Sequence, residues 1–194
     1  MTKICIYGAG AIGGYMAAAL AEAGADVSLI ARGPHLAAIK QNGLTLLKNG
    51  EAKTYQLTAS DNPADLGPQD FVIISMKANA ISKIADAMQP LLGPETAVVS
   101  AINGLPWWYF HQANTGTDLD DKPLESVDPG SDIWKKIGPE RALGCVVYPA
   151  CEIAEPGVIQ HNEGERFSLG EPSGEITDRL KTLSSLLISG GLKA

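Results

Sequence analysis

Residues 8–13, near the start of the chain, have the pattern G-x-G-x-x-G, which can bind the pyrophosphate of a dinucleotide through backbone amides. The pattern follows an apolar run at residues 3–7 and precedes a proline-free run of small residues, 11–23, so it lies where a strand is expected to turn into a helix. The first glycine would allow the tight turn, the second would let pyrophosphate approach, and the third would let the helix pack against the strand. A turn with a purely structural role is the alternative. The candidate phosphate-binding residues are Gly8, Ala9, Gly10, Ala11, Ile12 and Gly13.

The second predicted strand, residues 26–31, ends at Arg32, about where the contact with the adenosine ribose belongs. An NAD-selective site usually has Asp or Glu there, and Asp26 lies at the wrong end of the strand to replace it. A guanidinium cannot accept hydroxyl protons, but it suits a 2′-phosphate and can stack on adenine. Arg32 therefore favours NADP(H) over NAD(H), and an ordinary solvated arginine is the alternative.

Polar residues follow two further predicted strands. Lys77 comes after an apolar run at 70–76, and Asn103 comes after a run at 96–101. Because ligands gather at the carboxyl ends of parallel strands, both side chains are expected to point into one crevice. Asn103 could orient the nicotinamide ribose and a substrate oxygen, while Lys77 could attract an anionic substrate or the cofactor. The alternatives are an asparagine turn and a solvated lysine.

The elements expected around these residues make an α/β, Rossmann-type domain with a doubly wound, mostly parallel sheet. Residues 106–140 begin with Trp107 to Phe110, continue with many Asp, Gly and Pro residues, and predict a long, partly ordered insertion. The aromatic run would pack under this insertion or against another domain, and a lid over the substrate is the alternative. Helices are expected at 34–42, 78–89 and 176–188, a hairpin at 44–47 and 53–58 across Asn49-Gly50, and closing strands at 142–150, 157–160 and 166–169.

Composition argues against several classes of partner. The chain has 15 Lys and Arg against 22 Asp and Glu, a net charge of -7, so phosphate backbones and anionic lipids would repel it. Neither a secretory signal nor a membrane-spanning run is evident. The three cysteines have no redox or metal-ligand spacing, which fits a reducing compartment. We therefore expect a cytoplasmic protein that binds neither nucleic acid nor membrane.

Other side chains with chemical potential have simpler explanations. His35, His111 and His161 are scattered without a second ligand at a suitable spacing, so no metal site is predicted. Two cysteines, Cys145 and Cys151, fall in or beside an apolar strand and are expected to be inert thiols. No nucleophile-elbow pattern surrounds the serines Ser75 and Ser100, so a hydrolase is not indicated.

In order and spacing, several of these motifs together resemble the ketopantoate reductase (2-dehydropantoate 2-reductase) family. The matching segments are residues 8–13, 30–32, 75–78, 103–104, 144–150, 156–161 and 169–171, so the resemblance covers nearly the whole chain. It implies that the glycine loop, Arg32, Lys77 and Asn103 contact NADPH and that Asn103 also touches the substrate. It also implies that Ala150 lies beside the cofactor. The long segment at 106–140 departs from the family, which commonly has a short connection there.

The resemblance also implies what the intact enzyme does. It would reduce 2-dehydropantoate to pantoate with NADPH, in pantothenate and coenzyme A biosynthesis. In the family, the catalytic lysine and an acidic partner lie in an all-helical C-terminal domain, which we expect to be absent here; Lys193 is too near the end to replace that lysine. We expect residues 1–172 to form the NADP-binding domain, residues 173–194 to lead into the absent domain, and the chain to be inactive alone.

Two alternatives remain open. An NADP-dependent reductase of another 2-oxo acid or a sugar acid would keep every cofactor residue and change only the substrate. A stand-alone NADP-binding sensor that partners another protein is the alternative from a different class. The sequence leaves the oligomeric state open, a homodimer included.

Overall fold

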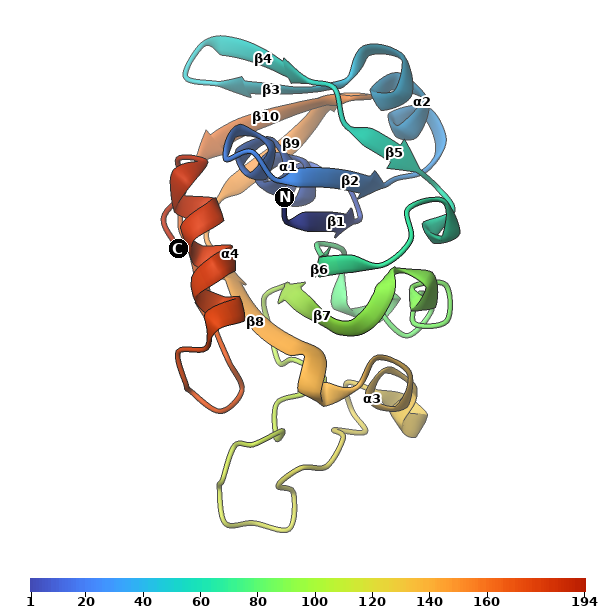
Figure 1. The fold of residues 1–194 in the computed structure, drawn as a ribbon, viewed down its shortest axis with the longest axis vertical. Coiled ribbons are helices and arrows are strands. Elements are labelled where there is room, and N and C mark those ends of the chain that lie inside the picture. The colour runs from blue at the N-terminus through green and yellow to red at the C-terminus, as the bar shows by residue number, and fades with distance from the viewer.

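A seven-stranded sheet forms the centre of the structure, a computed structural model that describes residues 1–194 (Figure 1). Its strands are β1 (Lys3–Tyr7), β2 (Asp26–Ile30), β5 (Thr58–Ser60), β6 (Gln69–Ile74), β7 (Leu92–Ala101), β8 (Ala142–Val147) and β11 (Phe167–Gly170). The order is β11-β8-β7-β6-β1-β2-β5, and all neighbours are parallel except β11 and β8. Because the order reverses beside β1, the predicted doubly wound, Rossmann-type sheet is confirmed.

A second sheet lies across helix α1 (Ala11–Glu22) from the first, at the top of Figure 1. Its strands are β3 (Leu44–Lys48), β4 (Glu51–Tyr55), β9 (Ala150–Glu155) and β10 (Val158–Glu163), in the order β4-β3-β10-β9. Strands β3 and β4 form the predicted hairpin. Its turn residues Asn49 and Gly50 have φ values of 54° and 81°, and two positive φ angles are what a type I′ turn requires.

Helix α1 is buried nearly all round because it packs between the two sheets and beside helix α4 (Asp178–Ser189). Its small residues permit these close approaches. A side chain at Gly14 would come within 2.6 Å of Ile159 in β10, and one at Gly190, just after α4, would overlap the backbone of Ala19. The larger of two apolar cores therefore joins α1, α4 and one face of the main sheet.

The opposite face of the main sheet is covered by residues 78–91 and by the long connection from β7 to β8. Parallel neighbours need a crossover of a dozen residues or more, so this connection is the crossover that β7 and β8 require. It contains helix α3 (Asp132–Ile137), whose Ile133 is buried together with Trp107. The carboxylate of the fully buried Asp128 accepts hydrogen bonds from the amides of Ile133 and Trp134, each at 2.9 Å. The aromatic run therefore contributes to packing at this face, as its first residue shows.

Several predicted elements were wrong in detail. Residues 78–89 are not an α-helix, because their turns bond mostly to the third preceding residue, although Ile81 and Met88 are buried at helical spacing. The strand expected at 142–150 is two strands, because the chain leaves the main sheet at Pro149 and enters the second. Helix α2 (Gly33–Asn42) and α4 match their predictions within two residues. Short 3-10 helices at Pro63–Asp65, Ala78–Ala80, Gln89–Leu91, Pro129–Ser131 and Pro139–Arg141 complete the fold.

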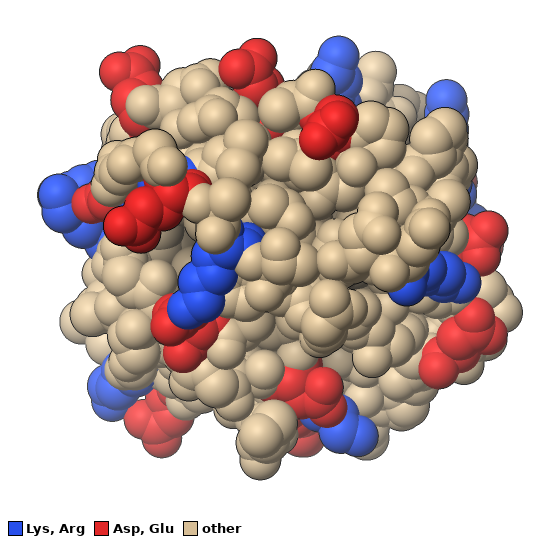
Figure 2. All heavy atoms as spheres, turned by 90° about the horizontal axis from the view of Figure 1, so that it is seen from above, with Lys and Arg blue, Asp and Glu red and all other residues tan.

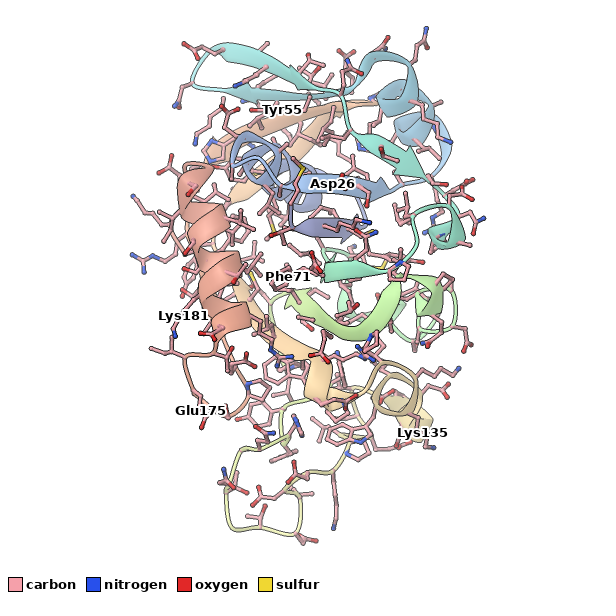
Figure 3. The ribbon with its side chains drawn as sticks, viewed as in Figure 1. Asp26, Tyr55, Phe71, Lys135, Glu175 and Lys181 are labelled. Carbon is pink, nitrogen blue, oxygen red and sulfur yellow. The ribbon has the colours of Figure 1, made fainter.

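Charged side chains are dispersed over the surface. Figure 2, which looks down on the face at the top of Figure 1, shows Lys and Arg lying singly among Asp and Glu. The labelled Lys135 and Lys181 likewise project outward from α3 and α4 (Figure 3). None of the helices has both the length and the apolar character that crossing a membrane requires.

Candidate functional site

The turn from β1 into α1 has the close contacts expected of a dinucleotide-binding loop. Gly8 has a φ of 102°, which other residues rarely adopt. At Gly13, a Cβ atom would overlap the carbonyl oxygen of Gly8 and lie 2.8 Å from Ile6, so only glycine lets α1 approach β1. The hydroxyl of Ser75, after β6, donates a hydrogen bond to the Gly8 carbonyl at 2.7 Å. The first and third glycines are therefore required by the fold itself.

Gly10 differs from the other two glycines. Its φ of -74° is open to any residue, and a Cβ atom there would have no neighbour within 4 Å. Neither backbone conformation nor packing therefore requires glycine, and the position faces open space. The amides of Ala11, Ile12 and Gly13, at the helix N-terminus beside this space, donate to no protein group. Free amides at a helix N-terminus suit an anion.

A cavity of about 400 Å³ opens beside this loop, at the carboxyl ends of β1 and β2. It lies at the topological switch point, where open α/β sheets bind ligands. Gly8, Ala9, Gly10 and Arg32 line it, which brings the glycine loop and the predicted selectivity residue to one site. Apolar side chains such as Ile30, Met76 and Ile84 form much of the remaining wall. A mostly apolar wall with a few polar groups is typical of a small-molecule site.

Arg32 lies two residues after the end of β2 and is the N-cap residue of α2, with an exposed side chain. Burial raises the pKa of Tyr7 in the same wall, and the positive charge of Arg32 partly opposes this rise. Asp26 lies at the opposite end of β2, beside Lys3 (Figure 3). The end of β2 nearest the cavity therefore carries a cation and no carboxylate.

Three further predicted site residues, Lys77, Asn103 and Ala150, do not line this cavity. Lys77 is exposed just after β6, and Ala150 is exposed at the start of β9. Asn103, also exposed, bonds twice to the backbone of Val147 at the end of β8: its amide nitrogen donates to the carbonyl at 2.8 Å, and its oxygen accepts from the amide at 2.9 Å. One N–H and one lone pair of Asn103 remain free. The roles of Lys77, Asn103 and Ala150 as ligand contacts stay predictions.

Three polar lining residues were missed by the sequence reasoning. Asp61 and Lys83 reach the cavity from the segments after β5 and β6. His35, near the start of α2, bonds to the glycine loop and to the turn between β9 and β10. Lys83 had no sequence signal, because it fell within the helix expected at 78–89 and belonged to no motif. His35 lies three residues after Arg32, which was the one available signal.

The cysteines match the inert thiols that the sequence predicts. Burial raises the pKa of Cys145 to about 12 and that of Cys151 to about 11, the latter partly opposed by Lys48. Burial likewise raises the pKa of Cys5 to about 12, although the neighbouring Ser28 hydroxyl acts in the opposite direction. No cluster of three or more His, Cys, Asp or Glu residues suited to a metal ion is present in the structure.

Comparison with known proteins places these features in a family. Residues 4–114 match the family model described as "Ketopantoate reductase PanE/ApbA". A 2-dehydropantoate 2-reductase of Mesorhizobium japonicum is 50% identical over 193 residues, which are 99% of this chain and 59% of that protein.

Solved structures agree with this result. A candidate ketopantoate reductase from Ralstonia solanacearum MolK2 matches with a TM-score of 0.92 and 42% identity, over 100% of this chain and 60% of that one. A 2-dehydropantoate 2-reductase from Geobacter metallireducens GS-15 matches with a TM-score of 0.79 and 27% identity, over 98% of this chain and 56% of that one. The chain thus spans about three fifths of the length of these relatives.

Proposed function

Because this chain belongs to the ketopantoate reductase family, we propose that it provides the NADP(H) site of an enzyme that reduces 2-dehydropantoate to pantoate. The observation that carries this proposal is the environment of Gly10. Its position is open although nothing in the fold requires glycine, and the free amides of α1 lie beside it. A pyrophosphate can use this space and these donors, and no side chain of the protein does so.

The choice of NADP(H) over NAD(H) rests on the charges around the cavity. Arg32 and Lys83 contribute two positive charges to the lining, against the one negative charge of Asp61. A 2′-phosphate would be attracted by this excess, whereas the ribose hydroxyls of NAD(H) would find no carboxylate at the end of β2. Arg32 is the residue that selects the cofactor, because it occupies the position of the ribose contact.

The residues at the neighbouring strand ends position the substrate. When bound, the reduced nicotinamide supplies a hydride to the keto carbon of the substrate. The free N–H of Asn103 orients the substrate oxygen, and its two bonds to Val147 hold the amide in place. The exposed ammonium of Lys77 attracts the anionic substrate or the phosphates of the cofactor, and Ala150 lies beside the nicotinamide.

Reduction also needs a proton donor near the developing alkoxide. None of the residues proposed above has this role, and the resemblance to the family implies that a lysine of an all-helical domain supplies the proton. In this division, residues 1–172 are the cofactor domain and residues 173–194 lead toward the helical one. The 194-residue chain should therefore bind NADPH without turnover, and a steady rate of pantoate formation by this chain would contradict the assignment.

The substrate class and the setting are also proposals. The substrate is a small 2-oxo acid, the compartment is the cytoplasm, and neither nucleic acid nor membrane is a partner. Reduction of another 2-oxo acid or a sugar acid is the second candidate, and a panel of such acids presented to the complete enzyme distinguishes it. A stand-alone NADP-binding sensor would bind the cofactor equally well but would require a protein partner.

Calorimetric titration with NADPH and NADH tests the cofactor assignment. The unsubstituted chain should bind NADPH more tightly than NADH. Arg32→Ala should lower the affinity for NADPH about 10- to 100-fold, because a charge-assisted bond to phosphate is lost, and should change the affinity for NADH little. Lys40→Ala, on the same helix, changes charge equally and serves as the control. Equal affinities for the two nucleotides in the unsubstituted chain would contradict the proposal.

A further inference from the structure

His35 joins two loops that are distant in sequence. It lies near the N-terminus of α2, with its Nε2 atom 2.6 Å from the carbonyl oxygen of Ala9 in the glycine loop. Its Nδ1 atom is 3.0 Å from the amide nitrogen of Gly157, in the turn between β9 and β10. Because a carbonyl only accepts, Nε2 must carry the hydrogen, and Nδ1 is then free to accept from Gly157. A neutral imidazole in one tautomer satisfies both partners.

Gly157 is itself firmly placed, so it can anchor the ring. Its carbonyl accepts a hydrogen bond from the amide of Thr45 in β3 at 2.9 Å. Its φ of 84° is one that glycine adopts readily, and a Cβ atom there would lie 3.1 Å from the Cβ of Ala38 in α2. The turn of the second sheet thus fixes the position of the His35 ring through Gly157, and the ring in turn fixes the glycine loop through Ala9.

The bond to Ala9 controls the orientation of one peptide group. The Ala9 carbonyl and the Gly10 amide belong to the same planar unit. His35 holds its oxygen, and the Gly8 carbonyl accepts from its N–H at 2.7 Å. If this unit rotated, the Ala9 carbonyl could turn toward the space beside Gly10 and repel a pyrophosphate there.

We propose that His35 is a positioning residue for the cofactor: it fixes the Ala9–Gly10 peptide so that the pyrophosphate meets amide donors and no carbonyl. This inference rests on the proposed function and deepens it. His35 acts through the loop. Its removal should therefore affect NADPH and NADH equally, because both contain the pyrophosphate, whereas Arg32 acts on the 2′-phosphate alone.

Two conservative substitutions separate the two hydrogen bonds. The amide oxygen of asparagine can stand where Nδ1 accepts from Gly157, but asparagine cannot reach Ala9. The amide nitrogen of glutamine can stand where Nε2 donates to Ala9. His35→Gln should therefore keep the bond to Ala9 and the position of the loop. His35→Asn should keep only the bond to Gly157 and lose the position of the loop. Each variant thus retains one of the two hydrogen bonds.

The experiment is titration of the 194-residue chain and its variants with NADPH and with NADH, together with thermal unfolding. His35→Asn and His35→Ala should each lower the affinities for NADPH and NADH about 5- to 20-fold and leave the ratio of the two affinities unchanged. The affinities of His35→Gln should remain within about threefold of those of the unsubstituted chain. His111→Ala is the matched control, because His111 also has a local hydrogen bond but lies in the β7–β8 crossover.

The outcomes are distinct. Folded His35→Asn with unchanged affinity, or a loss in His35→Gln equal to that in His35→Asn, would overturn the positioning role while leaving the proposed function intact. If His35→Ala does not fold, the asparagine and glutamine variants still give the comparison. Absence of binding by the unsubstituted chain would overturn the proposed function, and this inference with it.

Discussion

The Ser75 hydroxyl donates a hydrogen bond to the Gly8 carbonyl at 2.7 Å, which ties the segment after β6 to the turn between β1 and α1. The same small region excludes any side chain at Gly13, where a Cβ atom would overlap both the Ser75 hydroxyl and the Gly8 carbonyl. The glycine loop is therefore packed against the sheet at Gly8 and Gly13, whereas its side at Gly10 faces open space.

Gly13→Ala should destabilise the chain by about 2–3 kcal/mol, because the added methyl group meets backbone atoms that cannot move without shifting β1 or α1. Urea unfolding measures this change. Gly24→Ala is a useful comparison, since Gly24 follows α1 and has open space for a Cβ atom but a φ of 81°. Its cost should be limited to backbone strain, about 1 kcal/mol. A Gly13 variant as stable as the unsubstituted chain would contradict the packing described.

Asn103→Ala should lower the free energy of unfolding by about 1–2 kcal/mol, because both hydrogen bonds to Val147 are lost and the ends of β7 and β8 separate. Asn103→Asp keeps an acceptor for the Val147 amide, but it places a carboxylate oxygen against the Val147 carbonyl oxygen, and the two oxygens repel each other. It should therefore not restore stability. The measurement is equilibrium unfolding in urea at neutral pH, and a neutral effect of alanine would show that the two bonds contribute nothing.

The ion pair between Glu171 and Arg179 predicts a pH dependence of stability. Burial raises the pKa of Glu171, but hydrogen bonds from Arg179 and Thr177 outweigh this effect and lower the pKa below its ordinary value of 4.5. The stabilisation is thus complete above the unfolded-state pKa and is lost as the pH falls through the lower, folded-state pKa.

Glu171→Gln should remove this part of the acid dependence and cost about 2–4 kcal/mol at pH 7, because Arg179 keeps its bonds to the backbone of Ala142 but loses its carboxylate. Unfolding free energies measured from pH 7 to pH 3 provide the test. Glu175→Gln, on the exposed loop before α4, is the control and should change little (Figure 3). Parallel pH profiles for the Glu171 variant and the unsubstituted chain would contradict the prediction.

The thiols should react slowly in the folded chain. With a pKa of about 11, Cys151 has about 0.1% thiolate at pH 8, and Cys145, with a pKa of about 12, has less. Alkylation by iodoacetamide, followed by mass spectrometry, should label Cys151 first and the two buried cysteines only after denaturant is added. Rapid labelling of Cys145 in the native chain would show that β8 opens locally.

The sequence was most informative where local geometry alone determines the structure. Asn49 and Gly50 predicted their turn because two positive φ angles restrict the residue choice there. Helix α3 was missed because the carboxylate that caps it belongs to Asp128, three residues before the N-cap position, Ser131. Strand β9 was missed because it is a mostly exposed edge strand without a buried apolar face, and its pairing with β10 and packing against α1 arise only in the tertiary structure.

The same distinction applies to the candidate site. Gly8, Gly10 and Arg32 were found from spacing along one strand-helix-strand unit, and the structure brings them to one cavity. Lys83 reaches this cavity from a separate crossover, and no pattern within that segment could indicate it. The bond between His35 and Gly157 joins residues whose proximity only the second sheet creates.

Gly10→Ala tests the central claim most directly. The protein itself has room for the added methyl group, but this group would occupy the space that the pyrophosphate of a bound cofactor needs. We predict an unfolding temperature within about 2 °C of the unsubstituted chain, since the φ angle is permitted and no atom lies within 4 Å. In the same sample, calorimetric titration should show NADPH and NADH both bound at least about tenfold more weakly. A stable Gly10→Ala chain that binds both nucleotides as tightly as the unsubstituted chain would contradict the claim that this loop holds the pyrophosphate.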